Sequence, residues 1–141
     1  MDELIDIVDE QNRVLHQEHK NIAHEKGLLH MIILAEIRDS SGNFVLVKQA
    51  PGRQDPGAFV SPVGGHIQAG ESEVEALKRE AGEEVGITGF AYKFIGRDIY
   101  DRKVIGRHEN HLFILYEIYS DQEPVLNHES VDYLRISPAD L

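Results

Sequence analysis

Runs of apolar residues separated by polar turns predict strands along most of the chain. Residues 4–8 and 14–15 lie on either side of a turn-rich segment and predict an N-terminal hairpin over about 4–16. The stretch 28–37 is almost continuously apolar, and 44–47 follows it after a Ser-Ser-Gly-Asn turn. These two segments predict a hairpin of central strands in the core of a sheet.

The second half of the chain contains three more strand-like segments. Residues 90–100 and 111–119 predict strands joined by a basic segment at 101–107. Residues 131–136 predict a last short strand.

Two polar segments connect the earlier elements. Residues 16–27 contain three histidines and predict a loop or one short helix that ends at Gly27. Residues 50–59 carry proline and glycine breaks and predict an exposed loop, which is a candidate substrate loop because of its position before a glycine-rich turn at Gly64 and Gly65. Strands of this kind around a helix indicate an α/β (α+β) fold with a mixed sheet.

One segment has helical periodicity. It begins near Glu71 and Ser72 and ends at Gly86, because glycine is favoured at the C-terminal end of helices. Apolar residues recur at helical spacing along it and predict a core-facing stripe of Val74, Leu77, Ala81 and Val85.

Three carboxylates on this helix indicate a metal site. Glu80, Glu83 and Glu84 are related by i, i+3 and i+4 and therefore lie on one strip of the helix surface. Like charges so placed repel each other unless a cation lies among them. Mg²⁺ prefers such oxygen ligands and commonly binds through carboxylates and substrate phosphates.

Composition narrows the class of protein. The chain has 141 residues, of which 41% are hydrophobic, so we expect a single domain over 1–141. The net charge of −11 argues against binding of nucleic acid polymers or membranes. The absence of cysteine excludes disulfides and thiol catalysis. The acidic start of the chain shows no signal peptide or membrane span, so we expect a cytoplasmic protein.

The segment 65–87 resembles the complete signature of the Nudix hydrolases. Gly65, Glu71 and the run Arg79-Glu80-Ala81-Gly82-Glu83-Glu84-Val85-Gly86-Ile87 carry the resemblance. A mid-helix glycine such as Gly82 costs about 1 kcal/mol relative to alanine, but the family pattern leaves that position free. The resemblance implies an α/β/α sandwich with a mixed sheet. It also implies a C-terminal helix, which we expect to be absent or truncated in a chain that ends at Leu141.

The resemblance also implies roles for individual residues. Glu71 and Arg79 would form a structural pair, although Glu75 could pair with Arg79 instead at a spacing of i, i+4. The metal shell would consist of the Gly65 carbonyl, Glu80, Glu83 and Glu84, with Glu109 as a further carboxylate.

The implied activity is that of a pyrophosphohydrolase acting on a phosphorus anhydride. Water activated by Mg²⁺ or Mn²⁺ would attack a diphosphate phosphorus in a nucleoside-diphosphate-type substrate. One of the three helix glutamates or a carboxylate elsewhere would serve as general base.

A second resemblance points to one branch of the family. Residues 6–15, 28–49 and 55–72 are similar to the branch that includes isopentenyl-diphosphate isomerase. That isomerase needs a cysteine just ahead of its Gly-His pair, and here Gly64 stands at that position. An isomerase is therefore disfavoured. A non-catalytic ligand-binding Nudix domain is a further alternative, but it would usually have lost the signature glutamates.

Cations outside the helix are candidates for substrate binding. Arg53 and Arg107 would bind an outer phosphate or a sugar, together with His66 near the phosphates. Ordinary solvated arginines are an equally good interpretation of the first two. The expected partner is a small diphosphate substrate, and a homodimer is compatible with the sequence.

Histidines predict a second metal site by resemblance to the isomerase branch. That branch builds a separate site from histidines before and after the first core strand and from later carboxylates. The corresponding set here is His24, His30, His66, Glu109 and His111. Such an imidazole-rich set would favour a divalent transition metal such as Zn²⁺, Mn²⁺ or Fe²⁺. Chance alignment among eight histidines is the alternative.

Overall fold

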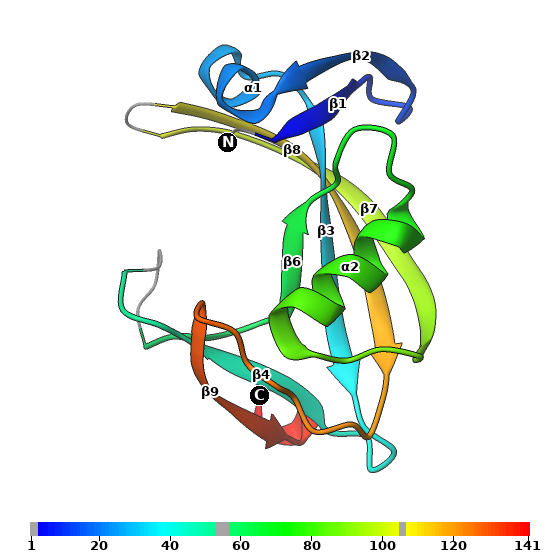
Figure 1. The fold of residues 1–141 in the computed structure, drawn as a ribbon, viewed down its shortest axis with the longest axis vertical. Coiled ribbons are helices and arrows are strands. Elements are labelled where there is room, and N and C mark those ends of the chain that lie inside the picture. The colour runs from blue at the N-terminus through cyan, green and yellow to red at the C-terminus, as the bar shows by residue number, and fades with distance from the viewer. Residues whose placement is uncertain (1–2, 53–56, 105–106) are drawn as a thin grey trace.

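The computed structural model of the chain describes residues 3–52, 57–104 and 107–141, and it does not describe the side chains of 102–108. Within these ranges nine strands form one mixed sheet and two α-helices pack against it (Figure 1). The elements in chain order are β1 (Leu4–Val8), β2 (Val14–His19), α1 (Lys20–Lys26), β3 (His30–Arg38), β4 (Phe44–Gln49), β5 (Phe59–Val60), β6 (Val63–His66), α2 (Glu73–Val85), β7 (Ala91–Val104), β8 (Arg107–Tyr119), β9 (Ser130–Ile136) and the short 3₁₀ helix η1 (Pro138–Asp140). The predicted α+β class and mixed sheet are confirmed. No helix in the described part of the chain is long and apolar enough to cross a membrane.

Strand β3 is the centre of the sheet. It pairs antiparallel with β1, β4 and β6 and parallel with β8. Side chains alternate between the two faces of a strand, so the apolar residues of β3 divide between them. Met31, Ile33, Ala35 and Ile37 are buried on the face that carries α2. His30 is fully buried on the opposite face.

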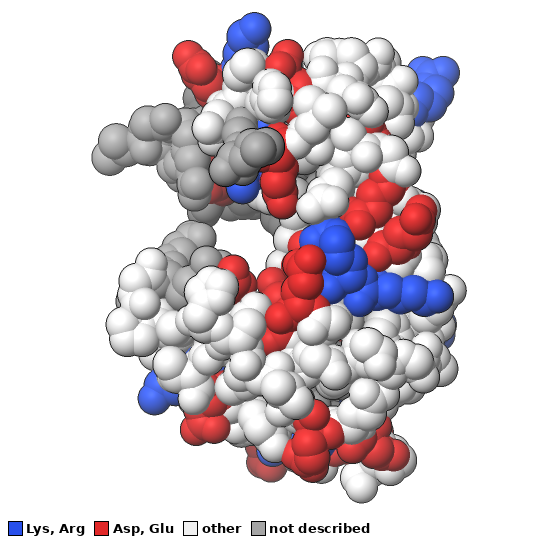
Figure 2. All heavy atoms as spheres, viewed as in Figure 1, with Lys and Arg blue, Asp and Glu red and all other residues white. Residues whose placement is uncertain are grey.

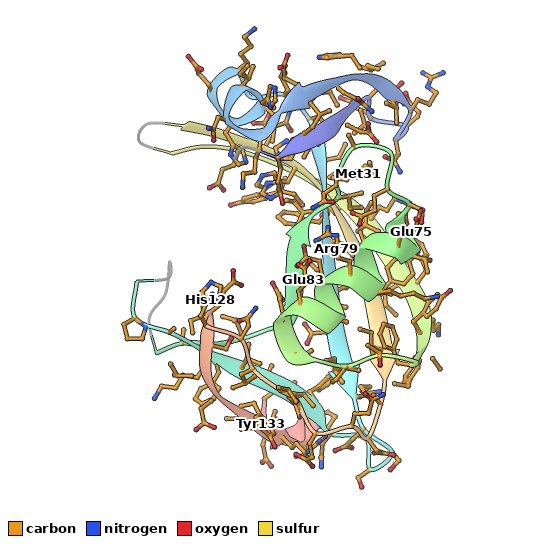
Figure 3. The ribbon with its side chains drawn as sticks, in the orientation of Figure 1. Met31, Glu75, Arg79, Glu83, His128 and Tyr133 are labelled. Carbon is orange, nitrogen blue, oxygen red and sulfur yellow. The ribbon has the colours of Figure 1, made fainter. Side chains whose placement is uncertain are left out.

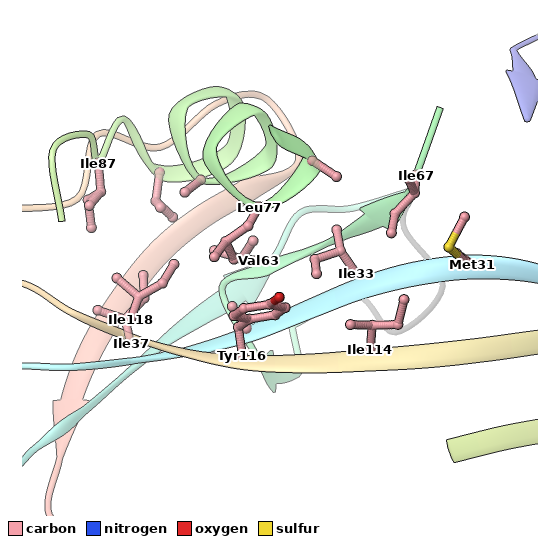
Figure 4. Close-up of a cluster of buried hydrophobic side chains, with 14 of the residues drawn as sticks. Met31, Ile33, Ile37, Val63, Ile67, Leu77, Ile87, Ile114, Tyr116 and Ile118 are labelled. Carbon is pink, nitrogen blue, oxygen red and sulfur yellow. The ribbon is translucent and has the colours of Figure 1, made fainter. Parts of the chain in front are cut away.

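Helix α2 covers one face of the sheet through the predicted apolar stripe. Figure 4 shows Leu77 between this helix and the strands that carry Val63, Ile33 and Tyr116. Complete burial of a leucine side chain contributes roughly 2 kcal/mol. This packing fixes the orientation of the helix and of the polar side chains on its neighbouring strip.

The ends of α2 are set by local hydrogen bonds. Ser72 Oγ accepts from Glu75 N at 3.1 Å, and Glu75 Oε1 accepts from Ser72 N at 3.1 Å, which is a capping box. Gly86 ends the helix with a positive φ of 64°, a conformation that glycine adopts without strain. Glu75 is therefore engaged at the start of the helix.

Helix α1 and the N-terminal hairpin form the other end of the molecule. Ala23 of α1 packs with Ile5 and Ile7 of β1 in a second, smaller apolar cluster. The helix ends at Gly27, whose φ is 68°, as the sequence predicts. The packing of Ala23 against β1 holds α1 at one end of the sheet, close to β8.

Two segments that were predicted to be connections are instead parts of strands. The glycine-rich turn is instead strand β6, in which Gly64 and Gly65 pair with β3. Glycine fits there because added Cβ atoms would press on Leu34 and collide with the Glu80 carboxylate. Much of the basic segment at 101–107 likewise belongs to β7 and β8, which continue as a two-stranded ribbon.

Two further segments also differ from the prediction. Residues 16–19 belong to β2 rather than to a loop, since they pair with β1. Strand β4 pairs with β3 at only two positions and then pairs along most of its length with β9. The predicted central hairpin therefore opens at its far end, and β4, β5 and β9 form a separate arm of the molecule (Figure 1). Figure 2 shows a hollow between this arm and the opposite end, with acidic side chains on its wall over α2.

Candidate active site and metal centre

Arg79 donates hydrogen bonds to four residues on and beside α2. Its Nε and Nη2 atoms donate to the two carboxylate oxygens of Glu71 at 2.7 and 2.9 Å. Its Nη1 atom donates to Glu80 at 2.8 Å and to Glu83 at 3.3 Å. Its Nη2 atom also donates to the carbonyl oxygen of His66 at 3.1 Å. The structure thus pairs Arg79 with Glu71 and not with Glu75.

This network changes the acidity of its members. Burial opposes ionisation of Glu71, but the hydrogen bonds from Arg79 and from Gln68 N, together with the charge of Arg79, outweigh it, so the pKa of Glu71 is lowered. The same hydrogen bonds raise the pKa of Arg79. Burial raises the pKa of Glu80 despite the contact with Arg79. A buried carboxylate of this kind is ready to accept a further positive charge.

Two of the signature glutamates, Glu80 and Glu84, contact strand β6. Gly64 N donates to Glu84 Oε2 at 3.1 Å. The Glu80 carboxylate fills the space where a side chain at Gly65 would stand. Figure 3 shows Arg79 and Glu83 on the side of α2 that faces β6. Carboxylate and carbonyl oxygens are the ligands of hard divalent cations, so this donor set fits Mg²⁺ or Mn²⁺.

A small pocket of about 130 Å³ opens beside Glu84. Its other lining residues come from β4, β5, β6, the connection between β5 and β6, and the segment that enters β9. They are Val47, Gln49, Val60, Ser61, Pro62, Gly64, Glu129 and Ser130. Asn127 holds this wall against α2, because its Nδ2 donates to the Glu83 carbonyl at 3.1 Å and its Oδ1 accepts from Glu129 N at 2.8 Å. The sequence carried no signal for Asn127, Glu129 and Ser130, since no motif includes them.

Four histidines from four elements converge on the sheet face opposite α2. One ligand atom from each lies within 4.8 Å of the others, and the residues are His24 of α1, His30 of β3, His66 of β6 and His111 of β8. The register of the sheet explains this, because His30 pairs with His111 and Ile32 pairs with His66. The Nε2 atoms of His24 and His66 lie 3.4 Å apart.

The protonation of His30 fits a metal ligand. Its Nδ1 atom lies 2.8 Å from the Leu28 carbonyl oxygen and donates to it in the neutral form. Its Nε2 atom is buried and has no hydrogen-bond partner among the described residues. Burial lowers the pKa of His30 to about 4 and that of His66 to about 3. Both rings are therefore neutral near pH 7. With Nδ1 of His30 bonded to Leu28, its Nε2 atom carries the free lone pair, as in ligating histidines whose other nitrogen donates a hydrogen bond.

The remaining predicted site residues divide between described and undescribed parts. Glu109 is buried on β8, two residues before His111, but it is not among the four residues whose ligand atoms meet. The predicted substrate ligand His66 has its ring in the histidine cluster. Arg53 lies outside the described residues, and only the backbone of Arg107 is described, in β8.

Comparison with known proteins identifies the family. The family model for the NUDIX domain matches residues 28–141. The uncharacterized Nudix hydrolase SCO1686 of Streptomyces coelicolor is 39% identical over 103 residues, which cover 69% of this chain and 57% of that protein. Isopentenyl-diphosphate Delta-isomerase 2 of Photorhabdus laumondii is 31% identical over 138 residues, covering 94% of this chain and 76% of that protein.

Solved structures share the fold. DR0079 from Deinococcus radiodurans superposes with a TM-score of 0.76 at 22% identity, covering 98% of this chain and 85% of that one. The MutT protein from Methanosarcina mazei gives a TM-score of 0.64 at 24% identity, covering 77% of each chain. The chain belongs to the Nudix family, and the predicted membership is confirmed. It spans a little over half the length of curated relatives such as SCO1686.

Proposed function

We propose that this protein hydrolyses a diphosphate linkage in a nucleoside-diphosphate-type substrate, with Mg²⁺ or Mn²⁺ bound by Glu80, Glu83 and Glu84. The observation that carries the proposal is the arrangement of these glutamates about the Gly64–Gly65 backbone and Arg79. Family membership supports hydrolysis of a pyrophosphate bond.

The chain's own residues have separate tasks in this reaction. Gly64 N–H orients the Glu84 carboxylate, and Arg79 orients those of Glu80 and Glu83. Glu71 neutralises Arg79 and so leaves the other three carboxylates available for a cation. The bound cation would lower the pKa of water and offset charge on the phosphoryl oxygens.

The bond changes follow from attack of water on phosphorus. A new bond forms between the water oxygen and one phosphorus of the diphosphate. The bond between that phosphorus and the bridging oxygen breaks, and a monophosphate leaves. A carboxylate at the site takes the proton of the water as general base. Arg53 and Arg107 are the proposed ligands for the outer phosphate or the sugar.

Isomerisation of isopentenyl diphosphate is the main competing activity, because the Photorhabdus relative bears that name. The mechanism of that branch needs a thiol, and this chain has no cysteine. A domain that binds a diphosphate without cleaving it is the second competitor. The signature carboxylates are all present, which favours hydrolysis over both.

A substrate panel tests the proposal. Nucleoside diphosphates, nucleoside triphosphates, dinucleotides and ADP-ribose are incubated with the protein in Mg²⁺ or Mn²⁺, and matched reactions contain a chelator in excess. We expect cleavage of at least one compound to a monophosphate product, and no cleavage with the chelator. Binding without cleavage would support the non-catalytic alternative and contradict hydrolysis.

We also propose a separate transition-metal site at His24, His30, His66 and His111. The close approach of four imidazole nitrogens carries this proposal, together with the orientation of His30 by Leu28. Neutral imidazoles suit Zn²⁺ and related ions better than Mg²⁺. Glu109, buried two residues before His111 on β8, remains a proposed further ligand of either metal.

Elemental analysis of protein purified without an affinity tag tests this second site. After exposure to Zn²⁺ and Mn²⁺, the wild type should retain about one equivalent of transition metal per chain. His30→Ala and His66→Ala should lose it, while the exposed His128 provides the matched control as His128→Ala. Substoichiometric metal in the wild type, or full retention of metal in His30→Ala and His66→Ala, would contradict the proposed site.

A further inference from the structure

Strand β7 is a long edge strand with an apolar surface. It spans 14 residues and pairs only with β8 in the described part of the chain. Five of its large apolar side chains are between 39% and 47% exposed, namely Tyr92, Phe94, Ile95, Ile99 and Tyr100. Figure 1 shows β7 at the outer edge of the sheet, and no other described strand pairs with its free side. Long apolar edge strands of this kind pair with other strands unless they are protected.

The exposed aromatic residues of β7 are held in place by the fold. Phe94 lies 5.6 Å from the ring of Tyr116, and the Arg97 guanidinium stacks 4.5 Å from the centre of the Phe94 ring. Arg97 also donates to the two carboxylate oxygens of Glu73 at 2.9 and 2.6 Å. This part of the edge is therefore a fixed surface that needs little ordering on binding.

We propose that β7 pairs antiparallel with β7 of a second copy of this chain, about a two-fold axis at Gly96. The pairing of β7 with β8 skips Ile95, which is a bulge outside the ladder. With the bulged residue left out, the two-fold sets Tyr92 opposite Ile99 and Phe94 opposite Arg97. It also sets Lys93 opposite Asp98.

The register with β8 places these partners on matching faces. Tyr92, Phe94, Arg97 and Ile99 pair with Ile118, Tyr116, Ile114 and Leu112, which all face the core under α2. Lys93 and Asp98 pair with Glu117 and Phe113 on the other face. A two-fold axis perpendicular to a sheet preserves its faces, so each proposed pair meets on one side. The Lys93–Asp98 pair occurs twice in the dimer, as the symmetry of such an interface requires.

Gly96 supports the position of the axis. A Cβ at this residue would meet no atom of the described residues within 4 Å, and its backbone φ is not in the left-handed region. The fold of a single chain therefore does not require glycine here. Glycine inside a strand commonly marks the close approach of another backbone, and the proposed axis brings the two copies closest at this residue.

Charge favours a second copy over an unrelated strand. Two copies of a chain with a net charge of −11 repel each other over most of their surfaces. Self-association therefore needs a local surface on which opposite charges of the two copies meet. Strand β7 offers lysine and aspartate at positions that face each other only when the strand meets its own copy. Opposite charges directly across two strands stabilise the pairing, and like charges weaken it.

Sedimentation velocity between about 1 and 100 µM tests the proposal with a charge exchange. The wild type should show a concentration-dependent species of twice 15.9 kDa. Lys93→Glu and Asp98→Lys should each weaken the dimer about tenfold, because each places like charges opposite at two symmetric positions. The double variant Lys93→Glu/Asp98→Lys restores opposite charges and should recover wild-type association. Lys78→Glu, on the exposed side of α2, is the matched control.

Three results would overturn the dimer. One is a wild type that stays monomeric over the whole concentration range, which would also be the outcome if β7 binds only a different protein. Another is a dimer that is insensitive to the single variants, which would place the interface elsewhere. The third is failure of the double variant to recover association although its circular dichroism matches the wild type. Protection of the outer β7 amides from hydrogen exchange should rise with concentration in the wild type and not in Lys93→Glu.

Discussion

The carbonyl oxygen of His66 accepts a hydrogen bond of 3.1 Å from Nη2 of Arg79. The ring of the same histidine lies in the four-imidazole cluster, while the same guanidinium binds Glu71, Glu80 and Glu83. Strand β6 therefore connects the two candidate metal sites through one backbone group. A substitution of Arg79 should therefore alter the geometry of both candidate metal sites.

The first prediction concerns Arg79→Lys. A lysine ammonium cannot reproduce the forked contact with Glu71 while also reaching Glu80 and His66. Since these groups are largely buried, we expect the free energy of unfolding to fall by about 2 kcal/mol. Urea unfolding measures the difference. Arg13→Lys is the control, because Arg13 is 75% exposed in its pair with Asp9 and should change stability by less than about 0.5 kcal/mol. Equal losses in the two variants would contradict the role of Arg79.

The second prediction concerns the metal-binding glutamates. Glu83→Gln and Glu84→Gln should each reduce kcat by about 10²-fold or more, because each removes an anionic ligand from the cation. Without metal, their thermal stability should be unchanged or slightly higher, since crowded carboxylates repel each other. Glu75→Gln is the control on the same helix, because glutamine can still serve in the capping box. An unchanged kcat at saturating Mg²⁺ would show that the substituted glutamate is not a ligand of the catalytic metal.

The third prediction concerns Gly65. In Gly65→Ala the new methyl group would collide with the Glu80 carboxylate, which must then move. We expect the affinity for Mn²⁺, measured by electron paramagnetic resonance, to fall about tenfold or more with only a small loss of stability. Gly82→Ala is the matched change, since a Cβ there would contact none of the described side chains or backbone atoms within 4 Å. It should leave Mn²⁺ binding intact and raise stability by about 1 kcal/mol. An unaltered affinity for Mn²⁺ in Gly65→Ala would show that Glu80 is not a ligand of the metal.

The fourth prediction concerns the pH dependence of stability in metal-free protein. In the unfolded chain His30 and His66 bind protons below about 6.5, whereas burial lowers their pKa values in the folded protein to about 4 and 3. Between these limits the unfolded state binds more protons, so the free energy of unfolding should fall as the pH drops from 6.5 towards 4. Urea unfolding at several pH values measures this slope.

Variants test whether the histidine cluster causes this pH dependence of the free energy of unfolding. His30→Asn should reduce the loss of stability between pH 6.5 and 4, while His128→Ala should keep it. Zn²⁺ should oppose the loss near pH 6.5, because the metal competes with protons for the same nitrogens. An equally steep loss in His30→Asn would mean that other groups control the acid stability.

Local sequence patterns were sufficient to predict the signature helix. The stripe of Leu77, Ala81 and Val85 determines which face is buried, and the residues around Ser72 and Gly86 determine the ends. Because Glu80, Glu83 and Glu84 lie on one strip of that helix, their common orientation follows from helical geometry. The partner of Arg79 was not determined locally, since Glu71 and Glu75 were both within reach.

Long-range register was beyond local patterns. His30, His66 and His111 meet because β6 and β8 flank β3 with a particular alignment, and that alignment arises from the packing of the whole sheet. Only the resemblance to a known branch brought these histidines together in the prediction. Asn127 and Glu129 had no such resemblance. Glu129 lines the Glu84 pocket and Asn127 bonds to the Glu83 carbonyl, because an irregular segment packs along α2.

Transfer of oxygen from water tests the central proposal most directly. The best substrate of the panel is hydrolysed with Mg²⁺ in water enriched in ¹⁸O, and the products are analysed by mass spectrometry. The account predicts one ¹⁸O atom in one of the two phosphate-containing products, with formation of that product nearly abolished in Glu84→Gln and retained in Glu75→Gln. Conversion of a diphosphate to an isomer without label, or binding of every panel compound without cleavage, would contradict it.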